Sequence, residues 1–314
     1  MEVIMQTPPN PVATVSILRM RRRHLVECVQ SIQPPFSRRE KWILMISTLF
    51  GCPVGCPMCD AGGNYAGILS VEEMATQIDH LVRGIFPDGR VRVSRFKIQF
   101  ARMGEPALNH HVLELLEQLP DRVRCTGALI PSLSTVAPEG REGFFRRLVQ
   151  IKNRLYSDGN FQLQFSLHST DSAQRDRMIP VKKWDFDQIA RYGKEFYRPG
   201  DRKITLNFAW GRGQVLDPEV IAAYFDPRCF LIKITPVNPT VRARKNRVEN
   251  LIESRNQAER LGPIRDLKRA GYRVIISIGE REENRIGSNC GQYIRQFLRS
   301  GSAPEGAYTY QKVE

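Results

Sequence analysis

Apolar and polar residues alternate along the chain with two periods, one typical of helices and one of strands. Between residues 70 and 86 the apolar residues recur at helical spacing. Ser70, with Glu73 three residues later, is the start signal of a capped helix. Similar helical spacings cover 110–119, 143–155, 184–197, 218–225 and 250–271. Short β-prone runs lie at 94–100, 122–130, 160–168, 203–210, 229–237 and 272–279.

This alternation of strands and helices predicts an α/β fold with a parallel sheet covered by helices. The count suits a partial or complete βα barrel, in which ligands bind at the carboxyl ends of the strands. Earlier β-prone runs at 12–20, 24–32 and 41–48 predict a small antiparallel extension. We therefore expect a loose N-terminus over 1–11, a β extension over 12–48, a barrel over 49–299 and a flexible tail over 300–314.

The composition of the 314-residue chain is that of a soluble globular protein. It contains 41% hydrophobic and 25% charged residues, and no apolar run is long enough to span a bilayer. The N-terminal residues lack the basic start and apolar stretch of a signal peptide. We therefore expect a cytoplasmic protein without a membrane segment. In that compartment clustered cysteines more often bind metal or do chemistry than form disulfides.

The formal net charge of +14 indicates a polyanionic partner, because neutralising phosphates releases counterions and gives affinity. Two local basic runs, Arg19–His24 and Val241–Arg247, favour this interpretation over a charge that only keeps the protein soluble. The alternative that each run is simply a solvated surface stays open at this point.

Three of the seven cysteines lie within eight residues of the segment GCPVGCPMCD. Cys52, Cys56 and Cys59 have the spacing C-x3-C-x2-C, in a predicted loop between a strand and a helix. Thiolates are the usual ligands of iron–sulfur clusters, and three of them leave one iron of a four-iron cluster open. A structural zinc site is the alternative, but such sites are closed by four ligands and no local Cys or His completes the set.

This cysteine spacing, after a strand and ahead of a βα barrel, resembles the signature of the radical S-adenosylmethionine superfamily. The resemblance implies a partial barrel of six βα units and a [4Fe-4S] cluster on Cys52, Cys56 and Cys59. It also implies that the open iron binds S-adenosylmethionine, which an electron from the cluster cleaves to a 5′-deoxyadenosyl radical. The superfamily usually has an aromatic residue before the third cysteine, where this chain has Met58.

Five further motifs, in order, resemble the RlmN/Cfr family of radical S-adenosylmethionine methyltransferases, which methylate adenine carbons in ribosomal and transfer RNA. The motifs are ARMGEPALN at 101–109, SLSTVAP at 132–138, FSLHSTDSAQRDRMIPV at 165–181, ITPVNP at 234–239 and GSNCGQY at 287–293. With the cysteine cluster they extend the resemblance from about residue 12 to 298. It implies an RNA partner, rRNA or tRNA, or a nucleotide substrate, a flavodoxin- or ferredoxin-type electron donor, and a monomer.

The family resemblance also implies roles for individual residues. Gly104 and Glu105 would meet the methionine amine of S-adenosylmethionine, as a carboxylate at a strand end suits an ammonium. Cys290 would accept a methyl group and present it to the radical, and Glu27 would act as a base on the substrate. The remaining residues implied for the S-adenosylmethionine pocket are Ser132, Ser166, Leu167, His168 and Asn238.

The chain departs from the family at two places. The family's second cysteine, seven residues before the first cluster cysteine, is Met45 here, and a thioether cannot form the disulfide that resolves the RNA–protein adduct. The family's N-terminal RNA-binding domain also has no counterpart ahead of the β extension. Three interpretations follow: a methyltransferase resolved by another group such as Cys28, a radical enzyme with another substrate, or a non-catalytic RNA-binding protein.

Overall fold

The computed structural model describes residues 1–8, 10–279, 286–288 and 293–294. It divides into two compact units. The first consists of Met1–Pro53, Cys59–Ser132 and the segment that starts at Gly279, and the second of Val54–Met58 and Leu133–Ile278. The tail predicted over 300–314 lies outside the described residues.

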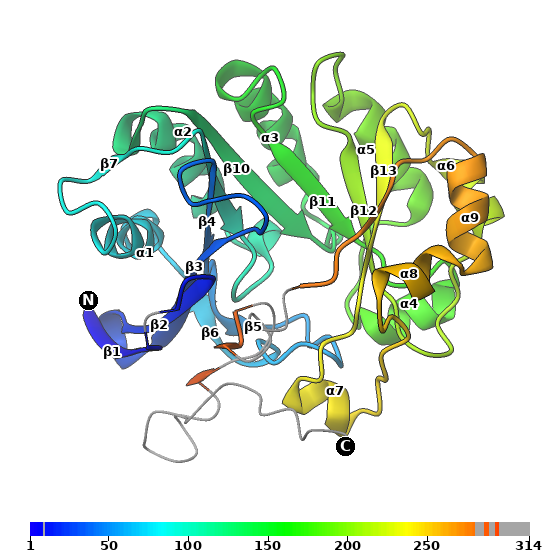
Figure 1. Ribbon diagram of the computed structural model, residues 1–314, viewed down its shortest axis with the longest axis horizontal. Helices are drawn as coiled ribbons and strands as arrows, with labels where there is room; N and C mark the ends of the chain where they lie inside the picture. The colour runs from blue at the N-terminus through cyan, green and yellow to red at the C-terminus, as the bar shows by residue number, and fades with distance from the viewer. Residues whose placement is uncertain (9, 280–285, 289–292, 295–314) are drawn as a thin grey trace. The chain divides into compact units, whose positions relative to one another are not determined.

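The first unit contains a sheet whose strands lie in the order β1-β2-β3-β4-β8-β10 (Figure 1). The last three residues of β10 belong to the second unit. The elements of the first unit are β1 (Glu2–Gln6), β2 (Ala13–Arg19), η1 (Arg21–Arg23), β3 (Leu25–Ile32), β4 (Lys41–Ile46), β5 (Leu49–Cys52), β6 (Gly63–Ile68), α1 (Val71–Arg83), β7 (Arg90–Val91), β8 (Arg95–Phe100), η2 (Pro106–Leu108), α2 (His111–Arg122), β9 (Arg124–Cys125) and β10 (Ala128–Thr135).

Strand β4 joins two kinds of pairing in this sheet. It pairs antiparallel with β3, where Met45 lies opposite Val29, and parallel with β8, where Met45 lies beside Gln99. Strands β1, β2 and β3 pair antiparallel with one another in turn. The antiparallel extension predicted from the sequence is therefore present, and β4 connects it to the parallel part.

Residues 2–6 form a strand, so the prediction of a loose N-terminus over 1–11 is wrong for these residues. β1 pairs with β2, with Val3 opposite Leu18 and Met5 opposite Ile17, and the register shifts between them. Met5 is buried in this pairing. A five-residue strand with an irregularity has little alternation of its own, and the edge of β2 supplies the hydrogen-bond partners that define it.

Helix α1 begins as the sequence predicted. The Ser70 side chain accepts the Glu73 N–H, and the Glu73 carboxylate accepts the Ser70 N–H, which completes a capping box. The helix buries Met74 and Ile78, and it contacts β3, β4 and α2. Gln77 fixes its position, because its side chain exchanges hydrogen bonds with the backbone of Ser47 directly after β4.

The second unit contains the parallel strands β11, β12, β13 and β14, which are adjacent in this order (Figure 1). This confirms the α/β class with a mostly parallel sheet. The elements of the second unit are α3 (Glu142–Leu155), β11 (Gln162–Ser166), α4 (Ser172–Met178), α5 (Phe186–Phe196), β12 (Ile204–Ala209), α6 (Pro218–Tyr224), β13 (Phe230–Thr235), α7 (Val241–Lys245), α8 (Arg255–Glu259), α9 (Gly262–Arg269) and β14 (Val274–Ile276).

The two faces of these parallel strands differ in polarity. One face carries fully buried aromatic and aliphatic side chains that pack on helices, as where the Phe145 ring of α3 meets Phe165 of β11 and Tyr192 of α5. The alternate residues form a row with polar members, since Ser166, Asn207 and Lys233 are aligned in register on β11, β12 and β13. Side chains alternate across a strand, so this row lies on the face opposite the aromatic core.

The predicted helix over 250–271 is two shorter helices. Helix α8 ends at Glu259, and α9 starts at Gly262 with Pro263 in its first turn. Proline lacks the N–H that would continue the hydrogen bonds of a preceding helix, but it fits the first turn of a new one. The sequence analysis did not predict the short helices α4 and α7.

Candidate active site

Two of the three clustered cysteines belong to the first unit and lie beside the same turn. Cys52 ends β5 and pairs with Gly63 of β6, and the Cys59 carbonyl accepts the N–H of Gly62 at 3.1 Å. Gly51 has φ of +73°, and a Cβ there would lie 2.6 Å from the Gly63 carbonyl oxygen. Only glycine lets the two strands approach this closely. The hairpin therefore holds both cysteines at one end of β5.

Cys56 lies in the segment Val54–Met58 of the second unit, and α7 with its flanking residues binds this segment through its carbonyl groups. The bonds run from Arg242 Nη2 to Gly55 at 2.7 Å, from Arg242 Nε to Cys56 at 3.2 Å, from Asn246 Nδ2 to Pro57 at 2.8 Å and from Thr240 Oγ1 to Met58 at 2.8 Å. Four consecutive carbonyls are thereby fixed. None of the described cysteines, those of the cluster segment included, forms a disulfide.

The basic run at 241–247 has a structural use that its composition did not reveal. Arg242 is half-buried against the cysteine segment, whereas Arg244, Lys245 and Arg247 are exposed. Thr240 caps α7 by accepting the Ala243 N–H. A threonine followed by good helix formers was the signal that would have predicted this helix.

The segment 101–109 folds against the start of β5 within the first unit. The Met103 carbonyl accepts the N–H groups of Thr48 and Leu49. Gly104 has φ of +99°, and a Cβ on it would lie 2.5 Å from the Leu49 side chain. Glu105 is buried, and its Oε1 accepts the Ala107 N–H at 3.0 Å. A buried carboxylate is thus fixed just beyond the carboxyl end of β8, where the sequence predicted a cofactor contact.

Two of the predicted cofactor contacts, Ser132 and Asn238, lie in different units. Ser132 is buried in β10 at the end of the first unit. Asn238 follows β13 in the second unit, is half-buried, and accepts the Thr240 N–H through its carbonyl at 2.8 Å. Asn238 therefore adjoins the N-terminus of α7, the helix that binds the Cys56 segment.

The segment Ser166–His168 ends β11 in the second unit and holds an imidazole in a fixed orientation. The N–H groups of Leu167 and His168 point to the Asn207 carbonyl, and His168 Nδ1 accepts the Ala209 N–H at 3.1 Å. Burial, with a smaller effect of Arg175, lowers the pKa of His168 to about 3. The ring is therefore neutral, with its proton on Nε2, and is a hydrogen-bond donor at that atom.

Sequence reasoning missed Asn207, which the structure places at this site. Its side chain is buried on β12, aligned with Ser166, and its Oδ1 has no hydrogen-bond partner among the described residues. A buried amide oxygen without a partner is costly, and a bound ligand that donates a hydrogen bond would remove that cost. The signal that could have identified Asn207 is its place as a polar residue inside the apolar run ITLNFA.

The neutral state of His168 gives a testable pH dependence. Its pKa is about 3 in the folded protein against about 6.5 when unfolded. Only the unfolded chain therefore binds the proton between these values, and stability falls as the pH drops below about 6.5. Asparagine tolerates the φ of +66° at this position. In His168→Asn we therefore expect the loss of folding stability with falling pH to be smaller, by up to about 1.4 kcal/mol per pH unit. Urea unfolding at pH 7, 6 and 5 measures it, and parallel wild-type and variant curves would contradict it.

Glu27, the predicted base, is a fully buried member of an ion pair. Its Oε2 accepts bonds from Arg102 Nη2 at 2.6 Å and Nε at 3.1 Å, and its Oε1 accepts the Ile294 N–H at 2.8 Å. Burial raises the pKa of Glu27, and the Arg102 guanidinium beside it opposes that rise. Both oxygens are thus engaged in bonds within the first unit, so the described contacts are those of a positioning residue.

Arg102 extends this ion pair to the segment that precedes Cys290. Its Nη1 donates to the Ser288 carbonyl and its Nη2 to the Gly287 carbonyl, both at 3.0 Å. Cys290 itself lies outside the described residues. Arg102 therefore binds Gly287 and Ser288, which precede Cys290 in the sequence. Glu27 binds Ile294, which follows Cys290.

Met45 and Cys28, the two residues considered for the resolving step, occupy opposite faces of the sheet. Met45 is half-buried and in register with Val29, so it shares a face with Glu27 two residues away. Cys28 is fully buried and paired with Ser16, whose hydroxyl meets His80 of α1. Burial raises the pKa of the Cys28 thiol, which disfavours the reactive thiolate. Cys28 does not share the face of Glu27.

The fold of this chain is similar to that of a protein whose structure has been solved. A solved structure of a radical SAM methyltransferase from Sphaerobacter thermophilus has a TM-score of 0.67 with this chain at 19% sequence identity, and the match covers 93% of this chain and 80% of that one. This similarity shows the fold. No family model matches the chain.

Curated relatives agree with the family resemblance drawn from the motifs. A probable dual-specificity RNA methyltransferase RlmN of Desulfitobacterium hafniense is 27% identical over 293 residues, which cover 87% of this chain and 72% of the relative. A protein of the same name from Streptomyces coelicolor is 29% identical over 210 residues, covering 63% of this chain and 54% of the relative. The chain thus resembles RlmN-type enzymes over most of its length.

Proposed function

We propose that the chain is a radical S-adenosylmethionine enzyme that transfers a methyl group to an adenine carbon of RNA through Cys290. The observation that carries the proposal is the three-cysteine segment, whose backbone carbonyls from 55 to 58 are bound by α7 and its flanking residues and whose cysteines form no disulfide. Thiolate donors with this spacing suit a [4Fe-4S] cluster with one open iron. The names of the curated relatives, which are those of RNA methyltransferases, support RNA methylation.

Polar residues in both units suit S-adenosylmethionine as the second cofactor. When bound, the cluster supplies the electron that cleaves S-adenosylmethionine to a 5′-deoxyadenosyl radical. The Glu105 carboxylate is suited to the cofactor ammonium group, close to the backbone of Gly104. Neutral His168 offers an N–H, and Asn207 Oδ1 offers a buried acceptor. We assign Ser132, Ser166, Leu167 and Asn238 as further contacts of S-adenosylmethionine.

Met45 favours a second candidate function, a radical enzyme on this scaffold with another substrate. A methionine cannot form a disulfide with Cys290, and Cys28 does not share the face of Glu27. If methyl transfer is retained, an external thiolate must attack the Cys290 sulfur of the RNA–protein adduct. The sulfur–carbon bond then breaks as a mixed disulfide forms with Cys290, the released carbon takes up a proton to become the methyl group, and a second external thiol reduces the mixed disulfide. The methylation state of Cys290 separates the two candidates.

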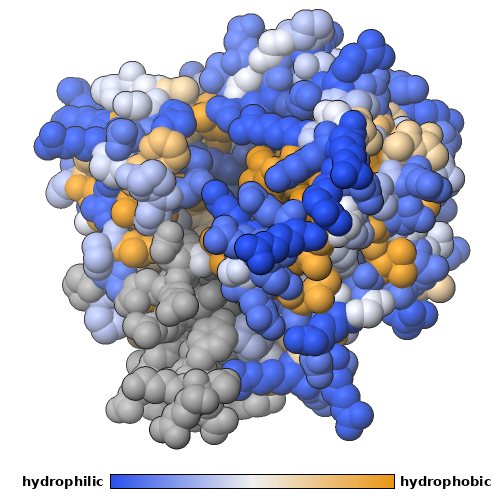
Figure 2. Space-filling view, turned by 45° about the vertical axis from the view of Figure 1, so that its right-hand side comes forward, coloured by the Kyte–Doolittle hydropathy of each residue, from blue (hydrophilic) through white to orange (hydrophobic). Residues whose placement is uncertain are grey.

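We further assign the RNA substrate to rRNA or tRNA and the electron source to a flavodoxin- or ferredoxin-type donor. The net charge of +14 supports a polyanionic substrate. Hydrophilic side chains cover most of the face seen in Figure 2, with apolar ones in smaller patches. No helix among the described residues is both long and apolar enough to cross a membrane. We propose a cytoplasmic monomer.

Anaerobic reconstitution with iron and sulfide tests the proposal at two levels. With S-adenosylmethionine and dithionite, we expect 5′-deoxyadenosine, and mass spectrometry of the peptide that contains Cys290 should show an added methyl group. Absence of 5′-deoxyadenosine would refute radical chemistry, and its presence with an unmethylated Cys290 would favour the second candidate. In Met45→Cys we expect release of any RNA that stays crosslinked to the wild type.

A further inference from the structure

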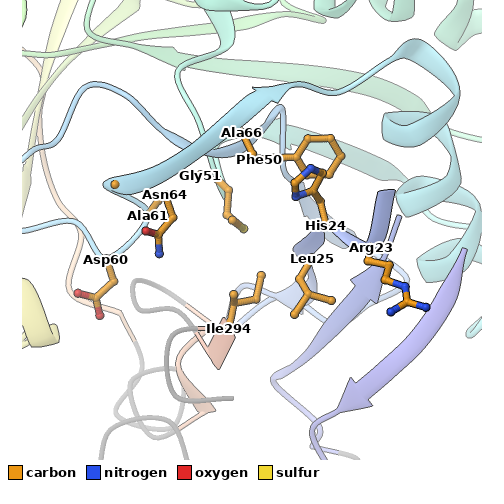
Figure 3. A pocket seen from close by; sticks show the side chains of 12 residues that line it. Arg23, His24, Leu25, Phe50, Gly51, Asp60, Ala61, Asn64, Ala66 and Ile294 are labelled. Carbon is orange, nitrogen blue, oxygen red and sulfur yellow. The ribbon is translucent and has the colours of Figure 1, made fainter. Parts of the chain in front are cut away.

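A pocket of about 240 Å³ opens beside the cysteine hairpin, and every residue that lines it belongs to the first unit (Figure 3). None of the three clustered cysteines is among its lining residues. The lining residues are Arg23, His24, Leu25, Phe50, Gly51, Asp60, Ala61, Gly63, Asn64, Ala66, Met103 and Ile294. The pocket therefore adjoins the predicted cluster site and also Ile294, which Glu27 fixes.

One side of the pocket is an aromatic surface. The rings of His24 and Phe50 lie with their centroids 5.0 Å apart and their planes tilted by 38°. Phe50 is buried, whereas His24 is half-buried, so an imidazole edge or face remains available. Leu25 adds an aliphatic surface beside the rings (Figure 3). Flat apolar walls of this kind bind planar aromatic ligands.

The opposite side carries hydrogen-bonding groups. Figure 3 shows Asp60 and Asn64 across the pocket from His24 and Phe50. Gly51 and Gly63 leave the wall between these sides without side chains, and the φ of +73° at Gly51 keeps it so. A flat ligand can thus reach both the rings and the polar side. An amide and a carboxylate together match the exocyclic amine and ring nitrogen of adenine.

The third feature is a positive charge at the pocket. Part of the basic run predicted to meet a polyanion forms η1, and Arg23, the last residue of η1, is exposed and lines the pocket. Arg23 has φ of +62°, a left-handed conformation that is unfavourable for arginine. Such strain is found at ligand-binding segments. Arg21 of the same turn pairs with Glu73 at 2.8 Å, whereas Arg23 lines the pocket, where it can meet a ligand phosphate.

We propose that this pocket binds an unpaired adenine nucleotide of the RNA substrate. The base stacks on His24 and Phe50, its amine edge faces Asn64 and Asp60, and its phosphate meets Arg23. Sequence-specific RNA binding generally uses unstacked bases held in this manner. The inference rests on the proposed function for the RNA as substrate, but binding itself requires no cluster.

Fluorescence anisotropy with a 5′-labelled five-nucleotide RNA tests the pocket on the full chain without iron. One strand contains a single adenosine among uridines, and the other contains uridines alone. We expect the wild type to prefer the adenosine strand, and His24→Ala to weaken its binding about tenfold, as loss of one stacked base does. Arg23→Gln should weaken both strands. His110→Ala is the matched control, since it removes an exposed imidazole that stacks on His111 outside the pocket.

Four results would overturn the proposal. Equal binding of both strands by the wild type, or equal losses in His24→Ala and His110→Ala, would show that the pocket does not bind adenine. Displacement of the strand by S-adenosylmethionine would assign the pocket to the cofactor, and tighter binding of adenosine monophosphate than of the adenosine strand would assign it to a free nucleotide. Asn64→Gly, compatible with φ of +50°, gives a second variant in case His24→Ala does not fold. Formation of 5′-deoxyadenosine is measured separately, so a failure of the proposed function can be distinguished from a failure of the adenine pocket.

Discussion

Cys56→Ser is expected to abolish both the iron–sulfur cluster and 5′-deoxyadenosine formation while leaving the protein folded. Cys56 lies in a segment whose carbonyls are bound by Arg242 and Asn246, so its backbone position does not depend on the thiol. A serine hydroxyl is a poor ligand for iron, and two remaining thiolates do not suffice for a cluster. Iron content per chain, absorbance of the reconstituted protein and 5′-deoxyadenosine by chromatography measure the effect.

Cys229→Ser is the matched control for this variant. Cys229 is a half-buried free thiol that directly precedes β13 in the same unit. A cluster that persists in Cys56→Ser, or an equal loss in both variants, would contradict the assignment.

A second pair of variants measures the effect of the backbone contacts. Arg242→Ala removes the bonds to the Gly55 and Cys56 carbonyls, and Arg244→Ala changes an exposed residue of the same helix. Loss of groups that position metal ligands typically costs about 10- to 100-fold in metal affinity. We expect that loss for Arg242→Ala only, and retention of iron in both variants would show that α7 does not support the cluster site.

Local signals in the sequence predicted the elements that depend on short-range interactions. The capping box of Ser70 and Glu73 involves residues three apart, and the βα alternation follows from side-chain period, so α1 and the parallel strands were predicted. β1 and α7 depend on partners elsewhere in the chain. β1 forms because it pairs with the edge of β2, and α7 lies against a segment more than 180 residues earlier in the sequence. Periodicity within a window cannot detect such pairs.

The candidate site shows the same division between local motifs and long-range contacts. Spacing and resemblance drew attention to Cys52, Glu105 and His168, because each lies in a recognisable short motif. Arg102 stands inside one of these motifs and was not singled out. Its partners are Glu27, 75 residues earlier, and the carbonyls of Gly287 and Ser288, 185 and 186 residues later. Only the fold brings these groups together, and it gives Glu27 the contacts of a positioning residue, while its role as a base stays a prediction.

Arg102→Ala is expected to destabilise the first unit strongly, because it leaves the buried Glu27 carboxylate without its counter-charge. The side chains of this pair are 2% and 0% exposed. Removing one partner of a buried ion pair typically costs about 3–5 kcal/mol, whereas replacing both with apolar residues can be nearly neutral. We therefore expect Glu27→Leu/Arg102→Leu to be more stable than Arg102→Ala. Urea unfolding of the three proteins gives the free energies.

The loss of folding stability in Arg102→Ala should also become larger as the pH rises. Burial already raises the pKa of Glu27, and without Arg102 only the hydrogen bond from the Ile294 N–H is left to oppose the rise. A carboxyl whose pKa is higher in the folded state contributes stability below its unfolded value of about 4.3, and loses it as the pH rises through the folded value. The difference in stability between Arg102→Ala and wild type should thus be larger at pH 8 than at pH 5. An equal difference at both pH values would contradict a charged Glu27 as the cause.

Hydrogen exchange separates a positioning role of this pair from general destabilisation. The Ile294 N–H donates to Glu27, so its exchange should accelerate in Arg102→Ala relative to amides of α1 in the same unit. Lys152→Met is the control, because it breaks a second buried ion pair, with Asp201, in the other unit. It should lose stability without accelerating exchange at Ile294. Equal acceleration at Ile294 in both variants would show that Glu27 and Arg102 do not hold this segment, and Glu27 would then lose its assignment as a positioning residue for the sequence around Cys290.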